Sequence, residues 1–199
     1  MNLKTTLKVA LIVVIELIFC FTPLGTIPIG PIAATLSMVP VIISSLTFGN
    51  RIGMFMGGVF GLCSFIYWTF IMPAFPTAFL FTPFSEAAMY KGNIFSLIIC
   101  FVPRILAGIT PNAVSKLFLS NKNEKSDIKA DVLGSILGSM TNTILVLLMI
   151  FVFFGREYST IVGKNLLIVL GMTVLTNGIP EAIISAILCP VVVRVLKKI

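Results

Sequence analysis

The sequence predicts an all-α integral membrane protein, a bundle of six transmembrane helices with both termini in the cytoplasm. Of its 199 residues, 58% are hydrophobic and 11% are charged, and the mean hydropathy is +1.12. A soluble globular domain carries about 25% charged residues. Each membrane crossing needs about 20 mostly apolar residues. Residues 1–199 are expected to form a single membrane domain, with helices near residues 5–22, 38–49, 51–71, 94–118, 130–154 and 165–196.

The first three helices are delimited by charge and turn residues. The first carries Lys4 and Lys8 ahead of its apolar run, like a secretory signal, but it contains Glu16 and no small-x-small cleavage site follows, so a retained helix is expected. The second is short for a span. It meets the third at Gly49-Asn50-Arg51, residue types that favour a tight turn, so these two helices should form a hairpin.

Small residues recur at intervals of four on two of the predicted helices. Such spacing lets helix backbones approach closely. We expect these glycines to serve internal packing, and the alternative is a docking face for another membrane subunit. They are Gly53, Gly57 and Gly61 on the third helix, and Gly134 and Gly138 on the fifth.

The cationic residues orient the bundle, because Lys and Arg are enriched in short cytoplasmic loops. With the amino terminus inside, three cations face outside: Lys91, Arg156 and Lys164. The cytoplasmic set is larger and explains the net charge of +7 as topology signals facing anionic headgroups, so no nucleic-acid partner is invoked. It comprises Lys4, Lys8, Arg51, Lys116, Lys122, Lys125, Lys129, Arg194, Lys197 and Lys198.

Polar side chains inside the predicted spans are the candidate substrate-binding residues, because such groups are costly in hydrocarbon and face the bundle interior. Arg104 and Glu181 each follow a proline, which bends a helix and frees a carbonyl one turn earlier. Asn177 shares a helix face with Glu181. Either Arg104 and Glu181 form a structural ion pair, or a binding pocket lies between the helices. The candidates are Arg104, Asn142, Asn177 and Glu181, with Glu16 as a further buried acid.

Several chemistries are not expected. The chain has no histidine, and its four cysteines lie singly in apolar runs, so we predict no metal site, no cofactor and no catalytic site. The stretch Gly155–Lys164 departs from the phosphate-binding loop, because its second glycine comes late and Asn165 follows the lysine. The chain is therefore not expected to hydrolyse ATP.

Two outer segments surround the mouth of the predicted pocket. Residues 22–33 combine prolines and glycines with apolar side chains, which suits a non-helical lid; its predicted gating residues are Gly25, Ile27, Pro28, Gly30 and Pro31. Residues 72–93 carry several prolines and aromatic residues. These aromatics either line the mouth or anchor the chain at the membrane interface.

Seven short motifs occur in a recognisable order along nearly the whole chain: Pro23–Ile32, Val39–Ile43, Phe48-Gly49, Phe60–Leu62, Cys100–Leu106, Ser139–Thr143 and Thr176–Glu181. In their order and spacing the chain resembles the substrate-binding S components of energy-coupling factor (ECF) transporters. The resemblance implies a vitamin-binding protein of a prokaryotic cytoplasmic membrane, gated by its first outer loop and working with a transmembrane coupling subunit and two ATP-binding subunits.

Pantothenate is the expected substrate, since the chain is similar to the pantothenate-type S components. A buried arginine suits its carboxylate, and amides with Glu181 suit its hydroxyl and amide protons. The alternatives are another vitamin such as riboflavin, an intramembrane enzyme, or a membrane scaffold without a ligand. Submicromolar vitamin binding by the isolated chain supports the S component, turnover of a lipid supports the enzyme, and neither result favours the scaffold.

Overall fold

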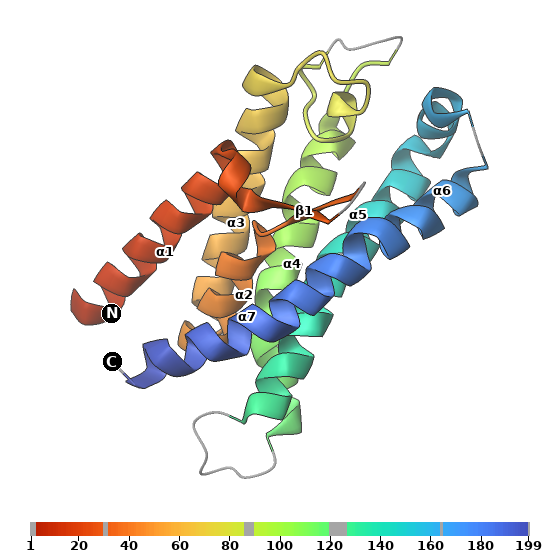
Figure 1. Ribbon diagram of the computed structural model, residues 1–199. Helices are drawn as coiled ribbons and strands as arrows, with labels where there is room; N and C mark the ends of the chain where they lie inside the picture. The colour runs from red at the N-terminus through yellow and green to blue at the C-terminus, as the bar shows by residue number, and fades with distance from the viewer. Residues whose placement is uncertain (1–2, 30–31, 86–89, 120–126, 164, 199) are drawn as a thin grey trace.

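The computed structural model describes residues 3–29, 32–85, 90–119, 127–163 and 165–198. It is a bundle of helices with one short β-hairpin (Figure 1). The elements are α1 (Leu3–Phe21), η1 (Pro23–Gly25), β1 (Thr26–Ile29), β2 (Ile32–Thr35), α2 (Met38–Phe48), α3 (Asn50–Ile66), η2 (Tyr67–Ile71), η3 (Ala78–Leu80), α4 (Ile94–Phe118), α5 (Ile128–Val162), α6 (Leu166–Thr173), η4 (Val174–Gly178) and α7 (Ile179–Lys198).

Four helical stretches are long and apolar enough to cross a membrane: Asn50–Ile71, Ile94–Phe118, Ile128–Ile161 and Leu166–Lys198. The prediction of a helical bundle is thus confirmed, with four of the six predicted spans long and apolar enough to cross a membrane. The two remaining predicted spans, α1 and α2, are not among these four stretches, one because of its charge and the other because of its length. Helix α1 carries Lys4, Lys8 and Glu16 among its 19 residues. Helix α2 has 11 residues and is therefore about 16 Å long.

Helix α2 lies at the centre of the bundle. Nine of its 11 residues are buried, and its apolar side chains pack with residues of α1, α3, α4 and α7 in one core cluster. The predicted turn to α3 is present. Gly49 adopts φ 93°, a conformation that favours glycine, and its N–H donates to the Ser45 carbonyl. Because α2 is buried among the other helices, its length need not match the thickness of the bilayer.

The last two predicted helices contain irregular backbone. The fifth was predicted to end at residue 154, and the chain does leave helical geometry at Phe154 (φ −134°, ψ 22°) before it continues to Val162. The last predicted helix, 165–196, consists of α6, the π-helical η4 and α7. The wider π turn precedes Pro180, which has no N–H to continue an α-helical ladder.

The glycine-rich faces serve internal packing, as expected. A Cβ on Gly53 would lie 2.0 Å from the carbonyl oxygen of Gly108, and a Cβ on Gly57 would lie 2.2 Å from that of Arg104. Helices α3 and α4 therefore touch backbone to backbone. On α5, a Cβ on Gly134 would lie 2.5 Å from the carbonyl oxygen of Pro111. These small residues thus fix the position of α4 between its neighbours.

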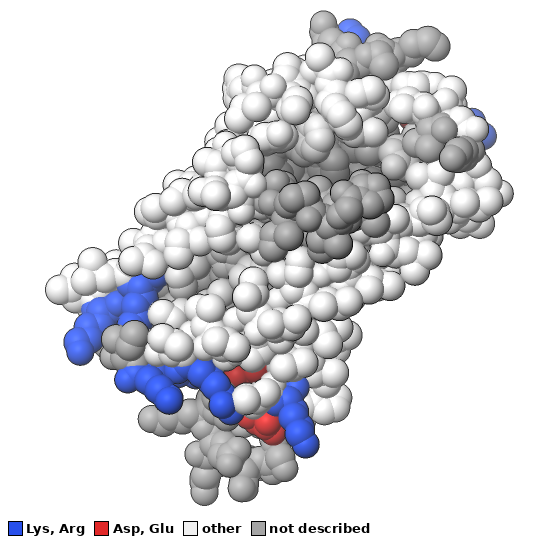
Figure 2. Space-filling model, viewed as in Figure 1, with Lys and Arg blue, Asp and Glu red and all other residues white. Residues whose placement is uncertain are grey.

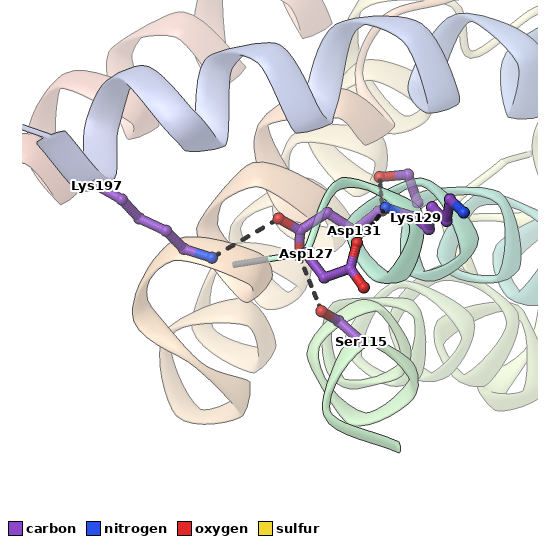
Figure 3. A network of polar contacts seen from close by, with 6 residues as sticks. Ser115, Asp127, Lys129, Asp131 and Lys197 are labelled. Carbon is purple, nitrogen blue, oxygen red and sulfur yellow. Dashed lines mark hydrogen bonds and ion pairs between the residues drawn. The ribbon is translucent and has the colours of Figure 1, made fainter. Parts of the chain in front are cut away.

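Both termini lie at one end of the bundle (Figure 1), and Lys and Arg side chains gather at that end in Figure 2. A polar network holds the helices together there (Figure 3). Asp131 is 1% exposed; its Oδ1 accepts from Ser115 Oγ at 2.8 Å, and its Oδ2 lies 3.8 Å from Lys197 Nζ. Lys8 Nζ donates to the Leu196 carbonyl at 3.0 Å. The network joins α1, α4, α5 and α7.

The α3–α4 contact yields a stability prediction. Gly57→Ala should lower the free energy of unfolding by about 1–3 kcal/mol, because the added methyl forces the helices apart. Gly58→Ala is the matched control, since a Cβ there meets no atom within 4 Å. It should be neutral or stabilising by up to about 1 kcal/mol. Thermal unfolding of both variants in detergent measures the difference, and equal midpoints would show that α3 and α4 are not in tight contact.

Candidate functional site

A cavity of 790 Å³ lies in the half of the bundle away from the two termini. The end of α1, the ends of the hairpin segment, α3 with η2, α4, α5, and α6 through α7 all contribute to its wall. The volume is within the range of small-molecule sites. Arg104, Asn142, Asn177 and Glu181 all line it. The structure therefore brings together four polar residues from three separate helical stretches.

Arg104 is the most deeply held of the four, at 6% exposure. Pro103 has no N–H, so it leaves the carbonyl of Ile99, four residues earlier, without its helical partner. The Nη1 of Arg104 donates to that oxygen at 2.6 Å. The proline and the arginine thus act together: one residue frees an acceptor, and the next residue uses it.

Two aromatic rings complete the surroundings of the Arg104 guanidinium. Its central carbon lies 5.6 Å from the centroid of the Phe60 ring and 5.2 Å from that of the Phe81 ring, within the range of cation–π attraction. Among the described residues no carboxylate forms an ion pair with Arg104, and its Nε has no hydrogen-bond partner. The cation is therefore open to an anionic partner.

Glu181 has a different partner from the two considered in the sequence. Its Oε1 accepts from both the hydroxyl (2.7 Å) and the backbone N–H (3.3 Å) of Thr35, at the end of β2. The described residues contain no ion pair between Glu181 and Arg104, so the structural ion pair weighed as an alternative is not formed. Glu181 instead links α7 to the segment between α1 and α2.

The two asparagines come from neighbouring elements, since a Cβ on Gly178, next to Asn177, would lie 3.0 Å from Thr143, next to Asn142. Asn142 on α5 is half-buried, and its Oδ1 is buried without a hydrogen-bond partner. Asn177 is exposed and belongs to the π-helical η4, where Thr173 at the preceding turn also faces the cavity. The second π-helical segment, η2, contributes Tyr67 and Trp68. Among the described residues, the two π-helical segments, η2 and η4, therefore both border the cavity. Such π-helical turns are frequent at functional sites.

The predicted gating segment is a β-hairpin. Strands β1 and β2 pair antiparallel, with Thr26 opposite Thr35 and Pro28 opposite Ala33, and Leu36 N–H donates to the Gly25 carbonyl at 2.7 Å. The described part of residues 22–33 forms no continuous helix, as expected, and contains one 3₁₀ turn at Pro23–Gly25. Its gating role stays a prediction. Gly25 is buried, and Ile27 lies in β1 with Pro28. Gly30 and Pro31 lie outside the described residues.

The second outer segment is divided between the two expected roles. Phe79 is fully buried, Phe81 lines the cavity, and Phe75 and Phe84 are 48% and 70% exposed. Sequence reasoning did not identify Thr35, Phe60, Tyr67, Trp68 or Phe81 as individual site residues. The cluster of aromatics between residues 72 and 93 was the one signal that pointed to this wall.

Glu16 lies outside the cavity wall. It is fully buried on α1; its Oε1 accepts from Cys20 Sγ at 3.3 Å, and its Oε2 has no partner. Cys20 and Cys63 do line the cavity. The described residues contain no group of three or more His, Cys, Asp or Glu side chains placed to hold a metal ion.

Comparisons with known proteins identify the family. A model of the substrate-specific component of ECF transporters matches residues 4–193. The chain is 39% identical over 191 residues to the pantothenic acid transporter PanT of Lactococcus lactis subsp. cremoris (strain MG1363), covering 96% of this chain and 90% of that relative. The chain therefore belongs to the family of ECF transporter substrate-specific components.

Proposed function

We propose that this chain captures pantothenate from outside the cell for an ATP-driven ECF importer. The observation that carries the proposal is Arg104, a buried cation on the wall of a 790 Å³ cavity that forms no ion pair with a carboxylate among the described residues. A carboxylate ligand supplies the missing charge through charge-assisted hydrogen bonds. The relative named for pantothenic acid supports this choice of vitamin.

The remaining polar groups fit the other end of pantothenate. The Asn142 Oδ1 needs a donor, and the hydroxyl and amide groups of pantothenate provide donors. Asn177 on η4 and the second carboxylate oxygen of Glu181 on α7 offer further acceptors in the same cavity. Riboflavin is the alternative vitamin, but it carries no carboxylate and would leave Arg104 buried without a counter-ion.

The proposed topology has six spans and both ends in the cytoplasm of a multi-pass cell-membrane protein. Its support is the gathering of Lys and Arg at the end that holds both termini (Figure 2), which by charge bias faces the cytoplasm. The cavity then lies in the outer half. The proposed partners are a transmembrane coupling subunit and two ATP-binding subunits, because the chain itself has no phosphate-binding loop.

We further propose that the segment between α1 and α2 controls access to the cavity, with Gly25, Ile27, Pro28, Gly30 and Pro31 as its gating residues. Support comes from both ends of the segment. Thr22 and Pro23 line the cavity before the hairpin, and Thr35 at the end of β2 and Ser37 just after it line the cavity on the other side. The Thr35–Glu181 contact is the point at which this segment is attached to α7.

The first test is binding by the purified chain in detergent without ATP, measured by isothermal titration calorimetry. Pantothenate should bind with a Kd below about 1 μM, or about −8 kcal/mol. Arg104→Gln should weaken binding by about 2–5 kcal/mol, because the buried charge pair is lost. Arg156→Gln, at an exposed arginine outside the cavity, is the control and should bind as the wild type does. Tight binding of riboflavin with none of pantothenate would refute the assignment.

The second test concerns Thr35 and Glu181. Thr35→Val removes the hydroxyl donor while keeping the side-chain shape, and it should speed the release of bound pantothenate. If the two residues act as one contact, adding Glu181→Gln should produce less than the sum of the single effects, with a coupling energy of about 0.5–3 kcal/mol. Release of radiolabelled pantothenate from the four proteins of the cycle gives this energy.

Thr22→Val is the matched control for this cycle. Thr22 also lines the cavity, but its hydroxyl donates to the Ile18 carbonyl of its own helix at 2.7 Å. It should therefore show no coupling to Glu181. Additive effects of Thr35→Val and Glu181→Gln would mean that Glu181 acts on the ligand independently of the hairpin.

A further inference from the structure

The Arg104 guanidinium is held by one carbonyl and two aromatic rings. The Ile99 carbonyl accepts one N–H, while the rings of Phe60 and Phe81 lie 5.6 Å and 5.2 Å from the guanidinium carbon. Phe60 comes from α3, which packs backbone to backbone on α4. Phe81 comes from the outer segment between η3 and α4, so a residue outside the helix bundle contacts the buried charge.

The segment that carries Phe81 is firmly attached to the bundle. The helical turn η3 immediately before it is buried, and Ser96 Oγ on α4 donates to the Phe79 carbonyl at 2.6 Å. Immediately after it, Thr82 is fully buried and accepts from Thr69 Oγ1 at 2.8 Å. Phe79, two residues before Phe81, is thus tied to α4, and Thr82, immediately after it, is tied to η2.

The Phe81 ring itself is fixed by a second aromatic contact. The rings of Trp68 and Phe81 stack with centroids 5.5 Å apart and planes inclined by 18°. Trp68 belongs to η2 and lines the same cavity. One face of Phe81 is therefore available for the guanidinium, and Trp68 restricts the ring from turning away.

Aromatic faces suit this position better than a carboxylate would. They attract a cation through the ring quadrupole without neutralising its charge or occupying its hydrogen-bond donors. Arg104 Nε has no partner in the described structure. The rings thus limit the cost of burying the cation and leave its donors free for a ligand.

We propose that Phe81 is a positioning residue that holds Arg104 for the ligand carboxylate and so sets the preference of the site for anionic over neutral ligands. The inference rests on the proposed function, since it assumes a carboxylate ligand. It assigns to the second outer segment a part in specificity that its aromatic composition alone does not indicate.

The experiment compares two ligands that differ in charge: pantothenate, and panthenol, in which an alcohol replaces the carboxylate. Phe81→Leu removes the ring but keeps an apolar side chain. The wild type should prefer pantothenate, and Phe81→Leu should reduce that preference about tenfold, the scale of a desolvated cation–π contact. Its affinity for panthenol should stay within about threefold of the wild type. Phe81→Tyr keeps the ring and should retain the preference.

Phe75→Leu is the matched control. The Phe75 ring also contacts Trp68, with centroids 5.7 Å apart, but it is 48% exposed and forms no cation–π contact with Arg104. It should keep the wild-type ratio of affinities. An unchanged ratio in Phe81→Leu, or an equal loss of affinity for both ligands, would overturn the proposal, because a merely structural role weakens both alike.

A ligand-free measurement separates this inference from the proposed function. Phenylglyoxal modifies arginine, and mass spectrometry of the peptide containing Arg104 follows its rate. The rate should rise in Phe81→Leu and stay at the wild-type value in Phe75→Leu. If the wild type binds neither pantothenate nor panthenol, the proposed function fails, while the modification rate still decides the role of Phe81; an unchanged rate overturns it.

Discussion

The site depends on the contact between Arg104 and the carbonyl of Ile99. A buried charge costs several kcal/mol unless its surroundings compensate for it. Pro103 supplies part of that compensation, because it cannot donate to Ile99 and so leaves a free acceptor within reach of the next side chain. The same residue that interrupts the helix therefore makes the position of the guanidinium possible. The other cavity groups are arranged around this cation.

The close packing of α3 on α4 gives the contact its precision. Gly57 meets the carbonyl of Arg104 itself, and Gly53 meets that of Gly108 one turn further along. A backbone held at this distance on one side restricts where α4 can bend at Pro103. It also brings Phe60, three residues after Gly57, to the guanidinium. Small residues in α3 thus contribute to the site although only Phe60, Cys63, Ser64 and later residues reach the cavity.

The sequence predicted the helices and the polar members of the cavity well, because both are local signals. Apolar runs define spans, and a charged residue inside a span has few places to go except inward. Thr35 and Phe81 were not predicted as site residues, since each acts through a contact between segments far apart in the chain: Thr35 lies 146 residues from Glu181. The π-helical η4 was also missed, because apolar periodicity does not distinguish it from an α-helix.

Arg104 and Glu181 each follow a proline, but Arg104 bonds within its own helix, whereas Glu181 bonds to the segment between α1 and α2. Arg104 is a donor, so it satisfies the carbonyl that its own proline frees. Glu181 also follows a proline, but a carboxylate and a carbonyl are both acceptors and cannot bond to each other. Glu181 must find donors elsewhere, and Thr35 provides two of them. The sign of the charge thus decides whether the side chain after the proline bonds within its own helix or to the segment between α1 and α2.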